Sequence, residues 1–351
     1  MGPKIYEIPI EEVFFFVIQT YSTSLLYLLL SKPVLHSAYL VKERKGDVWK
    51  TIKLGGQLAL GWGIKISLDW VRKGGDHTYM GLILVWAFPF LLFLWSLAYQ
   101  LLIKLPLANT VLPIALPTVY LWLVDSGALK RGTWIISAGT KTGLQLPFID
   151  LELEEAVFFF LTNCLIVFGL VAFDNALAIL HAFPAHFPQV APLPSPAMLL
   201  RALFLPAAAY DDDRVLGLKQ SVTRLQNKSR SFYLASGTFS GRLRIDLVIL
   251  YSFCRVADDL IDNAASPAEA KEWVGKLRKF LELSYGPDQK SANGNLTKAT
   301  DLNQGVATHY AIANFPSDTQ LSLLYLPTSR LDSQPLFDLS LIHISERAGN
   351  A

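Results

Sequence analysis

Long apolar runs dominate the first 180 residues, and charged positions become frequent again only after about residue 210. Several runs approach the roughly 20 residues that a helix needs to cross a bilayer. The expected spans are Val13–Leu30, Leu54–Trp70, Tyr79–Ile103, Leu107–Val124 and Ala156–Leu180. The second is the weakest, because Lys65 and Asp69 interrupt it. The pattern predicts a polytopic α-helical membrane domain over residues 1–180.

Two changes of pattern follow the last span. From His181 to Met198 the sequence (HAFPAHFPQVAPLPSPAM) is too rich in proline for regular helices, so residues 181–210 are expected to form a linker. Beyond it, apolar positions recur every three or four residues through Leu243–Ile261, which predicts a soluble helix. The expected fold is all-α, with a soluble domain over residues 211–351.

Composition narrows the class of protein. The chain is 52% hydrophobic and 17% charged, as expected for an integral, multi-pass membrane protein with the lipid bilayer as its partner. A net charge of +2 argues against a nucleic-acid partner. The two cysteines lie far apart, which argues against a disulfide framework or a zinc site. No GxGxxG follows a strand, so no flavin or nicotinamide site is expected, and the Gly61 and Gly63 pair is interpreted as helix packing.

Two segments read alike, Ile10–Thr20 (IEEVFFFVIQT) and Leu153–Asn163 (LEEAVFFFLTN). Carboxylates at the mouth of a bilayer helix are costly to desolvate, and the usual explanation is a function. A duplicated pair predicts two half-units that together build one acid site. Alternatively, each pair only begins a helix, where acids favour the N-terminal dipole. The shared aromatic context favours the acid site, whose matched residues are Glu11 with Glu154, Glu12 with Glu155, Phe15 with Phe158, and Phe16 with Phe159.

Asp125, which ends LWLVD, is a further candidate acid, with a loop carboxylate as the alternative. It precedes Glu154 by 29 residues, whereas only 10 residues precede Glu11. The counterpart of LWLVD in the first half-unit would therefore fall before Met1, and this half-unit is expected to be shortened, unless Met1 is an authentic start. Basic residues in Val41–Lys50 favour a cytosolic loop, but those at Lys130–Arg131 would then lie on the other side, so orientation stays open.

The soluble domain holds the sharpest chemical motif, YSFCRVADDLID. A helix would place Arg255, Asp258, Asp259 and Asp262 on one face, since they are spaced i, i+3, i+4 and i+7. Aspartates one turn apart can hold Mg²⁺, which often bridges to phosphates. A solvated acidic face is the alternative, but flanking apolar residues argue against it. Upstream, KSRSFYLAS supplies hydroxyls, a cation and aromatic rings.

KSRSFYLASGTF followed by YSFCRVADDLID resembles phytoene synthase, an all-α head-to-head prenyl synthase, over roughly Val215–Leu339. The resemblance implies condensation of two geranylgeranyl diphosphates to phytoene. It also implies that Mg²⁺ is held by Asp258, Asp259 and Asp262, that Arg255 contacts diphosphate, and that Ser231, Phe232 and Tyr233 line the entrance. The family's second aspartate-rich motif does not follow Asp262. The synthase half is therefore expected to be truncated and inactive.

The first domain resembles the membrane-embedded lycopene cyclases in PIEEVFFFVIQTYSTSLLYLLLSKPVLH, ALPTVYLWLVDSGALKRGTWII and LELEEAVFF. A cyclase followed by a synthase resembles the fungal bifunctional lycopene cyclase/phytoene synthases. This implies β-cyclisation of lycopene through γ-carotene to β-carotene, with a proton supplied by one of the glutamates or Asp125. It also implies a cytosolic synthase part and a carotenoid desaturase nearby.

Two other functions fit parts of the pattern. A membrane transporter or receptor with a helical cytosolic module would also carry repeated spans. The synthase motif argues against it. A non-catalytic, truncated fragment is the remaining alternative.

Overall fold

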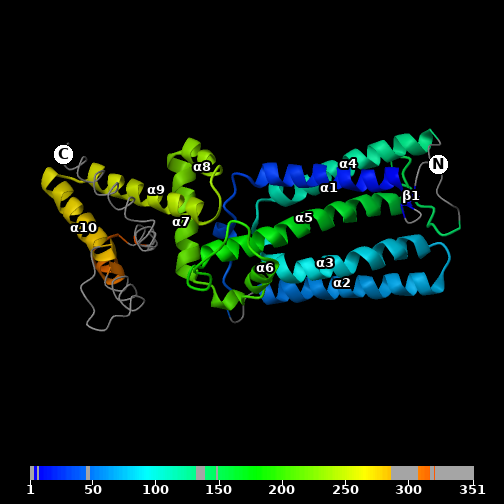
Figure 1. Cartoon of the computed structure of the whole chain (residues 1–351), viewed down its shortest axis with the longest axis horizontal. Helices are drawn as coiled ribbons and strands as arrows, with labels where there is room; N and C mark the ends of the chain where they lie inside the picture. Colours follow the sequence, from blue (N-terminus) through cyan, green and yellow to red (C-terminus); the bar gives the residue numbers. More distant parts are fainter. Residues whose placement is uncertain are drawn as a thin grey trace. The chain divides into compact units, whose positions relative to one another are not determined.

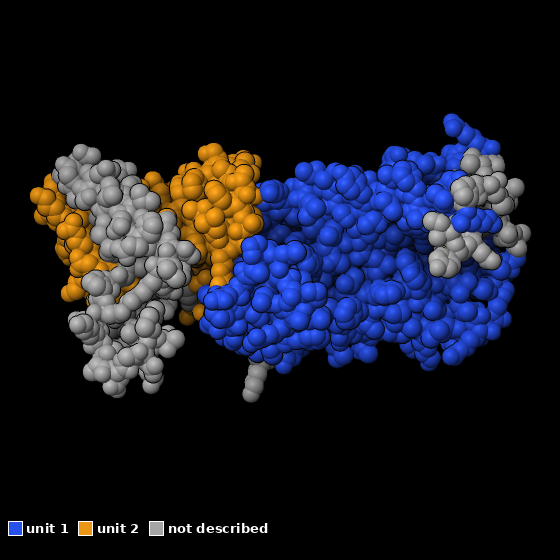
Figure 2. Space-filling model, viewed as in Figure 1, with its two compact units in different colours: residues 1–210 blue, residues 211–351 orange. Residues whose placement is uncertain are grey.

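The structure is a computed structural model, and it describes residues 4–5, 8–44, 48–131, 139–147, 149–285, 307–316 and 320. It divides into two compact units, Met1–Tyr210 and Asp211–Ala351 (Figure 2). The described residues are overwhelmingly helical, which confirms the all-α class. A small antiparallel hairpin of β1 (Lys4–Ile5) and β2 (Ile8–Pro9) is the exception among named elements.

Five long helices of the first unit alternate in direction, and each contains one of the expected apolar runs (Figure 1). They are α1 (Ile10–Ser31), α2 (Val48–Lys73), α3 (Thr78–Lys104), α4 (Leu107–Lys130) and α5 (Leu153–Ala182). Of these, α1, α3, α4 and α5 are long and apolar enough to cross a membrane. α5 packs against the other three and is the most deeply buried of the four.

The helix α2 is formed as expected, but it is not among the four helices that meet the length and hydropathy of a membrane span. It packs along α3 through glycines. A Cβ on Gly63 would lie 2.4 Å from the Phe88 ring, and a Cβ on Gly56 would lie 2.3 Å from the Trp95 ring. Gly61 faces open space. The interpretation of Gly61 and Gly63 as helix packing therefore applies to Gly63.

Replacing Gly56 by alanine is expected to destabilise the first unit by roughly 1–3 kcal/mol, because the new methyl displaces Trp95. The Trp95 indole also donates a hydrogen bond to the Lys53 carbonyl at 3.2 Å. Gly55→Ala is the matched control, since nothing lies within 4 Å of its Cβ position. Alanine has the better helix propensity, so this control is expected to be neutral or stabilising. Thermal unfolding of the purified protein measures both, and equal losses would contradict the packing.

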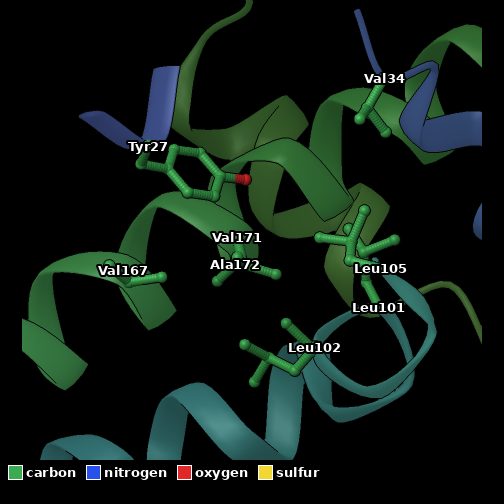
Figure 3. Close-up of a cluster of buried hydrophobic side chains, with 9 residues drawn as sticks. Tyr27, Val34, Leu101, Leu102, Leu105, Val167, Val171 and Ala172 are labelled. Carbon is green, nitrogen blue, oxygen red and sulfur yellow. The ribbon is translucent and has the colours of Figure 1, made fainter. Parts of the chain in front are cut away.

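The interior of the first unit is an apolar cluster shared by α1, α3 and α5 (Figure 3). Tyr27, Val167 and Val171 are fully buried in it. The outer surfaces are also apolar, with Val17, Leu29 and similar side chains more than half exposed. An apolar exterior around a bundle of helices is the arrangement that a bilayer requires.

The proline-rich segment after α5 differs from the expected linker. It carries the short helix α6 (Pro196–Leu203), which packs against α5. Proline at the first helical position loses no hydrogen bond, and the Ser195 side chain caps the helix by accepting from the Met198 amide. Phe183 and Tyr210 are buried, with ring centroids 4.9 Å apart. This segment is therefore part of the first unit.

The second unit is a separate helical cluster. Its named helices are α7 (Asp212–Lys228), α8 (Arg230–Ser236), α9 (Gly241–Asp262) and α10 (Pro267–Tyr285), and residues 307–314 are also helical. Asp211 caps α7 by accepting from the Arg214 amide at 3.1 Å. The core forms where Leu218, Phe253 and Phe280 are buried, on α7, α9 and α10 respectively.

Candidate functional site

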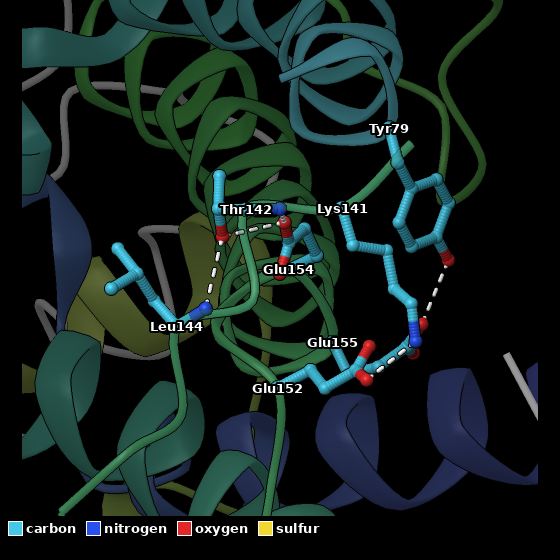
Figure 4. A network of polar contacts seen from close by, with 7 residues as sticks. All are labelled: Tyr79, Lys141, Thr142, Leu144, Glu152, Glu154 and Glu155. Carbon is cyan, nitrogen blue, oxygen red and sulfur yellow. Dashed lines mark hydrogen bonds and ion pairs between the residues drawn. The ribbon is translucent and has the colours of Figure 1, made fainter. Parts of the chain in front are cut away.

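Glu154 lies fully buried in the first turn of α5. Its Oε1 accepts hydrogen bonds from the backbone N–H of Thr142 at 2.7 Å and from the Thr142 hydroxyl at 2.8 Å (Figure 4). A fully buried carboxyl group is costly unless hydrogen bonds compensate it, and Thr142 supplies two.

The loop that carries Thr142 closes over this end of α5. Gly139 and Gly143 bracket it with φ of +105° and +70°, a left-handed conformation that favours glycine. Between them, the Thr140 carbonyl accepts from the Tyr79 backbone N–H at 3.1 Å. The Lys141 ammonium forms an ion pair with Glu152 at 2.5 Å. The loop therefore ties the start of α3 to the start of α5.

Glu155 completes a group of four carboxyl groups. Its Oε1 accepts a hydrogen bond from the Tyr79 hydroxyl at 2.8 Å. Asp125, Glu152 and Glu154 all lie close enough to interact electrostatically with it. Asp125 is 5% exposed and comes from α4. Carboxylates this close repel each other when ionised. These four residues are called the carboxyl cluster below.

The first repeat does not join the carboxyl cluster. Glu11 and Glu12 stand exposed in the first turn of α1, and neither is among the described carboxylates that interact with Glu155. Each repeated helix is nevertheless preceded by an antiparallel pairing, β1 with β2 before α1, and the bridge Gln145–Glu152 before α5. The two segments share their local architecture and differ in the burial of their acids.

Aromatic rings from both repeats meet beside the carboxyl cluster. The Phe15 and Phe159 ring centroids lie 6.0 Å apart, and so do those of Phe16 and Phe158. Trp86 of α3 adds a contact with Phe158, also at 6.0 Å. Phe158 follows Glu154 and Glu155 by about one helical turn, so it lies on the same side of α5.

A buried polar network crosses the bundle one turn further along. The Asn163 side-chain oxygen accepts from Thr23 at 2.8 Å and from Gln19 at 3.3 Å. Its amide nitrogen donates to Thr118 at 3.0 Å. Asn163 is fully buried, so it fixes the register of α1, α4 and α5 through hydrogen bonds that have no competitor in lipid.

In the second unit, α9 places the predicted acidic motif as its spacing requires. The Arg255 guanidinium donates to Asp259 Oδ1 at 2.5 Å, and the Lys228 ammonium of α7 lies 3.6 Å from Asp259 Oδ2. Asp258 is half-buried and Asp262 is exposed. Burial, and secondarily the Asp258 carboxylate, raises the pKa of the neighbouring Cys254 thiol to about 11, so this cysteine is not a nucleophile at neutral pH.

The other predicted residues of this unit point in different directions. On α8, Ser231 and Phe232 are exposed, while Tyr233 is 8% exposed and belongs to the core. The Phe232 ring stacks on Tyr251 of α9, with centroids 4.8 Å apart. Within the described part of the chain, no group of three or more His, Cys, Asp or Glu side chains is arranged to hold a metal ion. The described residues alone therefore do not fit a complete Mg²⁺ site.

Sequence reasoning missed four contributors to the carboxyl cluster and its surroundings, namely Tyr79, Lys141, Thr142 and Glu152. The available signal was the segment GTKTG at residues 139–143. Two glycines around three polar residues mark a tight loop, and this one lies shortly before the second glutamate pair.

Curated proteins are similar to almost the whole length of this chain. A curated protein of Leptosphaeria maculans named "Bifunctional lycopene cyclase/phytoene synthase" is 54% identical over 97% of this chain and 56% of its own length. The chain is a homologue of the fungal bifunctional lycopene cyclase/phytoene synthases. Proteins with the same name from Gibberella fujikuroi and Neurospora crassa are 52% and 47% identical, each over 97% of this chain. They are covered over 56% and 55% of their lengths.

This similarity extends over both units of the chain. The squalene/phytoene synthase family matches residues 225–331, which include α8 and α9. The chain spans about half the length of the curated relatives it matches. No solved structure matches the chain.

Proposed function

We propose that the first unit cyclises the ends of lycopene and that the carboxyl cluster supplies the acid. The observation that carries the proposal is the gathering of Asp125, Glu152, Glu154 and Glu155 at one end of an apolar, membrane-type helical bundle. Ionisable groups in such a place are usually functional. The names of the relatives supply the substrate class.

The chemistry needs a proton and no redox partner. A carboxylic acid protonates the terminal double bond of the polyene, the resulting cation closes the ring, and a carboxylate removes a ring proton. A positioned acid or base of this kind typically contributes about 10²–10⁴-fold in rate. The rings of Phe158 and Phe159 lie within about one turn of the cluster and are placed to stabilise positive charge by cation–π contact.

The test is pigment analysis in bacteria that accumulate lycopene and express residues 1–351. We expect γ- or β-carotene with the unaltered chain, and lycopene alone with the double variant Glu154→Gln, Glu155→Gln. Unchanged lycopene with the unaltered chain, once its presence in the membrane is verified, would count against the cyclase activity of this chain. If γ- or β-carotene still forms in the double variant, another residue must supply the proton.

For the second unit we propose a part in phytoene synthesis from geranylgeranyl diphosphate. The match to the squalene/phytoene synthase family supports this, as does the acidic face of α9. Asp258 and Asp262 stand one helical turn apart and are suited to share Mg²⁺, which would neutralise diphosphate charge. Asp259 is held by Arg255 and Lys228, so it supports the motif through ion pairs.

We further propose that the second unit faces the cytosol, where a charged diphosphate substrate is available. A carotenoid desaturase working nearby would convert phytoene into the polyene that the first unit uses. Phytoene synthesis would come before this desaturation, because it makes the hydrocarbon. Cyclisation of lycopene would come after it, because it closes the ends of the desaturated product.

A further inference from the structure

The hydrogen bonds at Glu154 distinguish its two oxygens. Oε1 accepts both the backbone N–H and the hydroxyl of Thr142. Oε2 is buried and has no hydrogen-bond partner within the described residues. In a neutral carboxyl group, the oxygen that accepts two hydrogen bonds is the carbonyl oxygen, so a proton on Glu154 resides on Oε2.

Two neighbours in the carboxyl cluster are held differently. Glu155 is half-buried and accepts one hydrogen bond from the Tyr79 hydroxyl. The charge of Glu152 is balanced by the Lys141 ammonium, 2.5 Å away. Glu152 Oε2 is also buried without a hydrogen-bond partner within the described residues. Only Glu154, however, combines complete burial with an Oε1 that accepts two hydrogen bonds and an Oε2 left to carry the proton.

We propose that Thr142 is a positioning residue that makes Glu154 the proton donor of the carboxyl cluster and directs its proton to Oε2. This inference rests on the proposed cyclase function and names the residues that act in it. In the step, the O–H bond at Oε2 breaks and a C–H bond forms at the terminal double bond. The carboxylate left behind keeps both hydrogen bonds from Thr142, and a ring proton later returns to a carboxylate of the cluster, so the reaction is an isomerisation.

Infrared spectroscopy of the full chain in lipid bilayers tests this without turnover. We expect Glu154→Gln to remove a carbonyl band of a neutral carboxyl group. Thr142→Val keeps the shape but loses the hydroxyl donor, so the band should move to higher frequency, whereas Thr142→Ser should leave it in place. Leu144→Ala is the matched control, because this exposed side chain lies in the same loop.

In lycopene-accumulating bacteria, we expect Thr142→Val to form about tenfold less cyclised product, as loss of one strong hydrogen bond predicts, with Thr142→Ser restoring it. The inference would be overturned if the carbonyl band of the neutral carboxyl group remained in Glu154→Gln, or if its frequency did not change in Thr142→Val. So would a loss of product in Thr142→Val that Thr142→Ser does not restore. Bands that respond as expected in a chain that cyclises nothing would support the proton placement while the proposed function fails.

Discussion

Glu154→Gln alone is expected to lower ring formation by at least about 100-fold, because glutamine has no proton to donate to the polyene. The substitution keeps the size of the side chain, and its amide oxygen still accepts both hydrogen bonds from Thr142. The bundle should therefore fold as before. The measurement is the ratio of cyclised carotenoid to lycopene at equal amounts of membrane protein.

The repeat supplies a matched control for this experiment. Glu11 occupies the position in the first repeated segment that Glu154 occupies in the second, yet Glu11 is exposed. Glu11→Gln is therefore expected to leave the ratio of products within about twofold, since surface substitutions of this kind change little. Equal losses in the two variants would show that both repeats contribute acids, contrary to the structure.

Phe253→Ala should destabilise the second unit by about 3–5 kcal/mol. The ring is fully buried on α9, and its removal leaves a cavity one turn before the acidic motif. Such a loss is a large part of the total stability of a small domain. Hydrogen exchange should accelerate throughout α7, α9 and α10.

Leu243→Ala on the same helix is the control for this prediction, because that side chain is 56% exposed. Its expected cost is below about 0.5 kcal/mol. Similar exchange rates in both variants would indicate that α9 does not form the core of this unit.

The sequence predicted the helices well because each apolar run carries its own signal. It could not show which acids are buried, since the two glutamate pairs read alike. The burial of Glu154 depends on a loop from residues 139–144, whose contacts are made across the fold. Similarly, the spacing of Arg255 and Asp259 predicted a shared face, but Lys228 reaches Asp259 from another helix.

The proline-rich segment shows a different limit. Proline density excludes the interior of a helix, yet Pro196 stands at the first helical position, where it is favoured. Contacts with α5 then fix the segment to the first unit. Local composition indicated irregular structure and carried no information about those contacts.

The crossed ring contacts have a consequence for the origin of the fold. Phe15 corresponds to Phe158 in the repeat and Phe16 to Phe159, yet Phe15 touches Phe159 and Phe16 touches Phe158. Reciprocal contacts between equivalent surfaces are the signature of a twofold-symmetric homodimer. An ancestor with one such segment would have paired with its own copy and carried two identical acids. Fusion of two such copies into one chain would release that constraint, so that one copy could bury a glutamate, as at Glu154, while the other kept its pair exposed, as at Glu11 and Glu12.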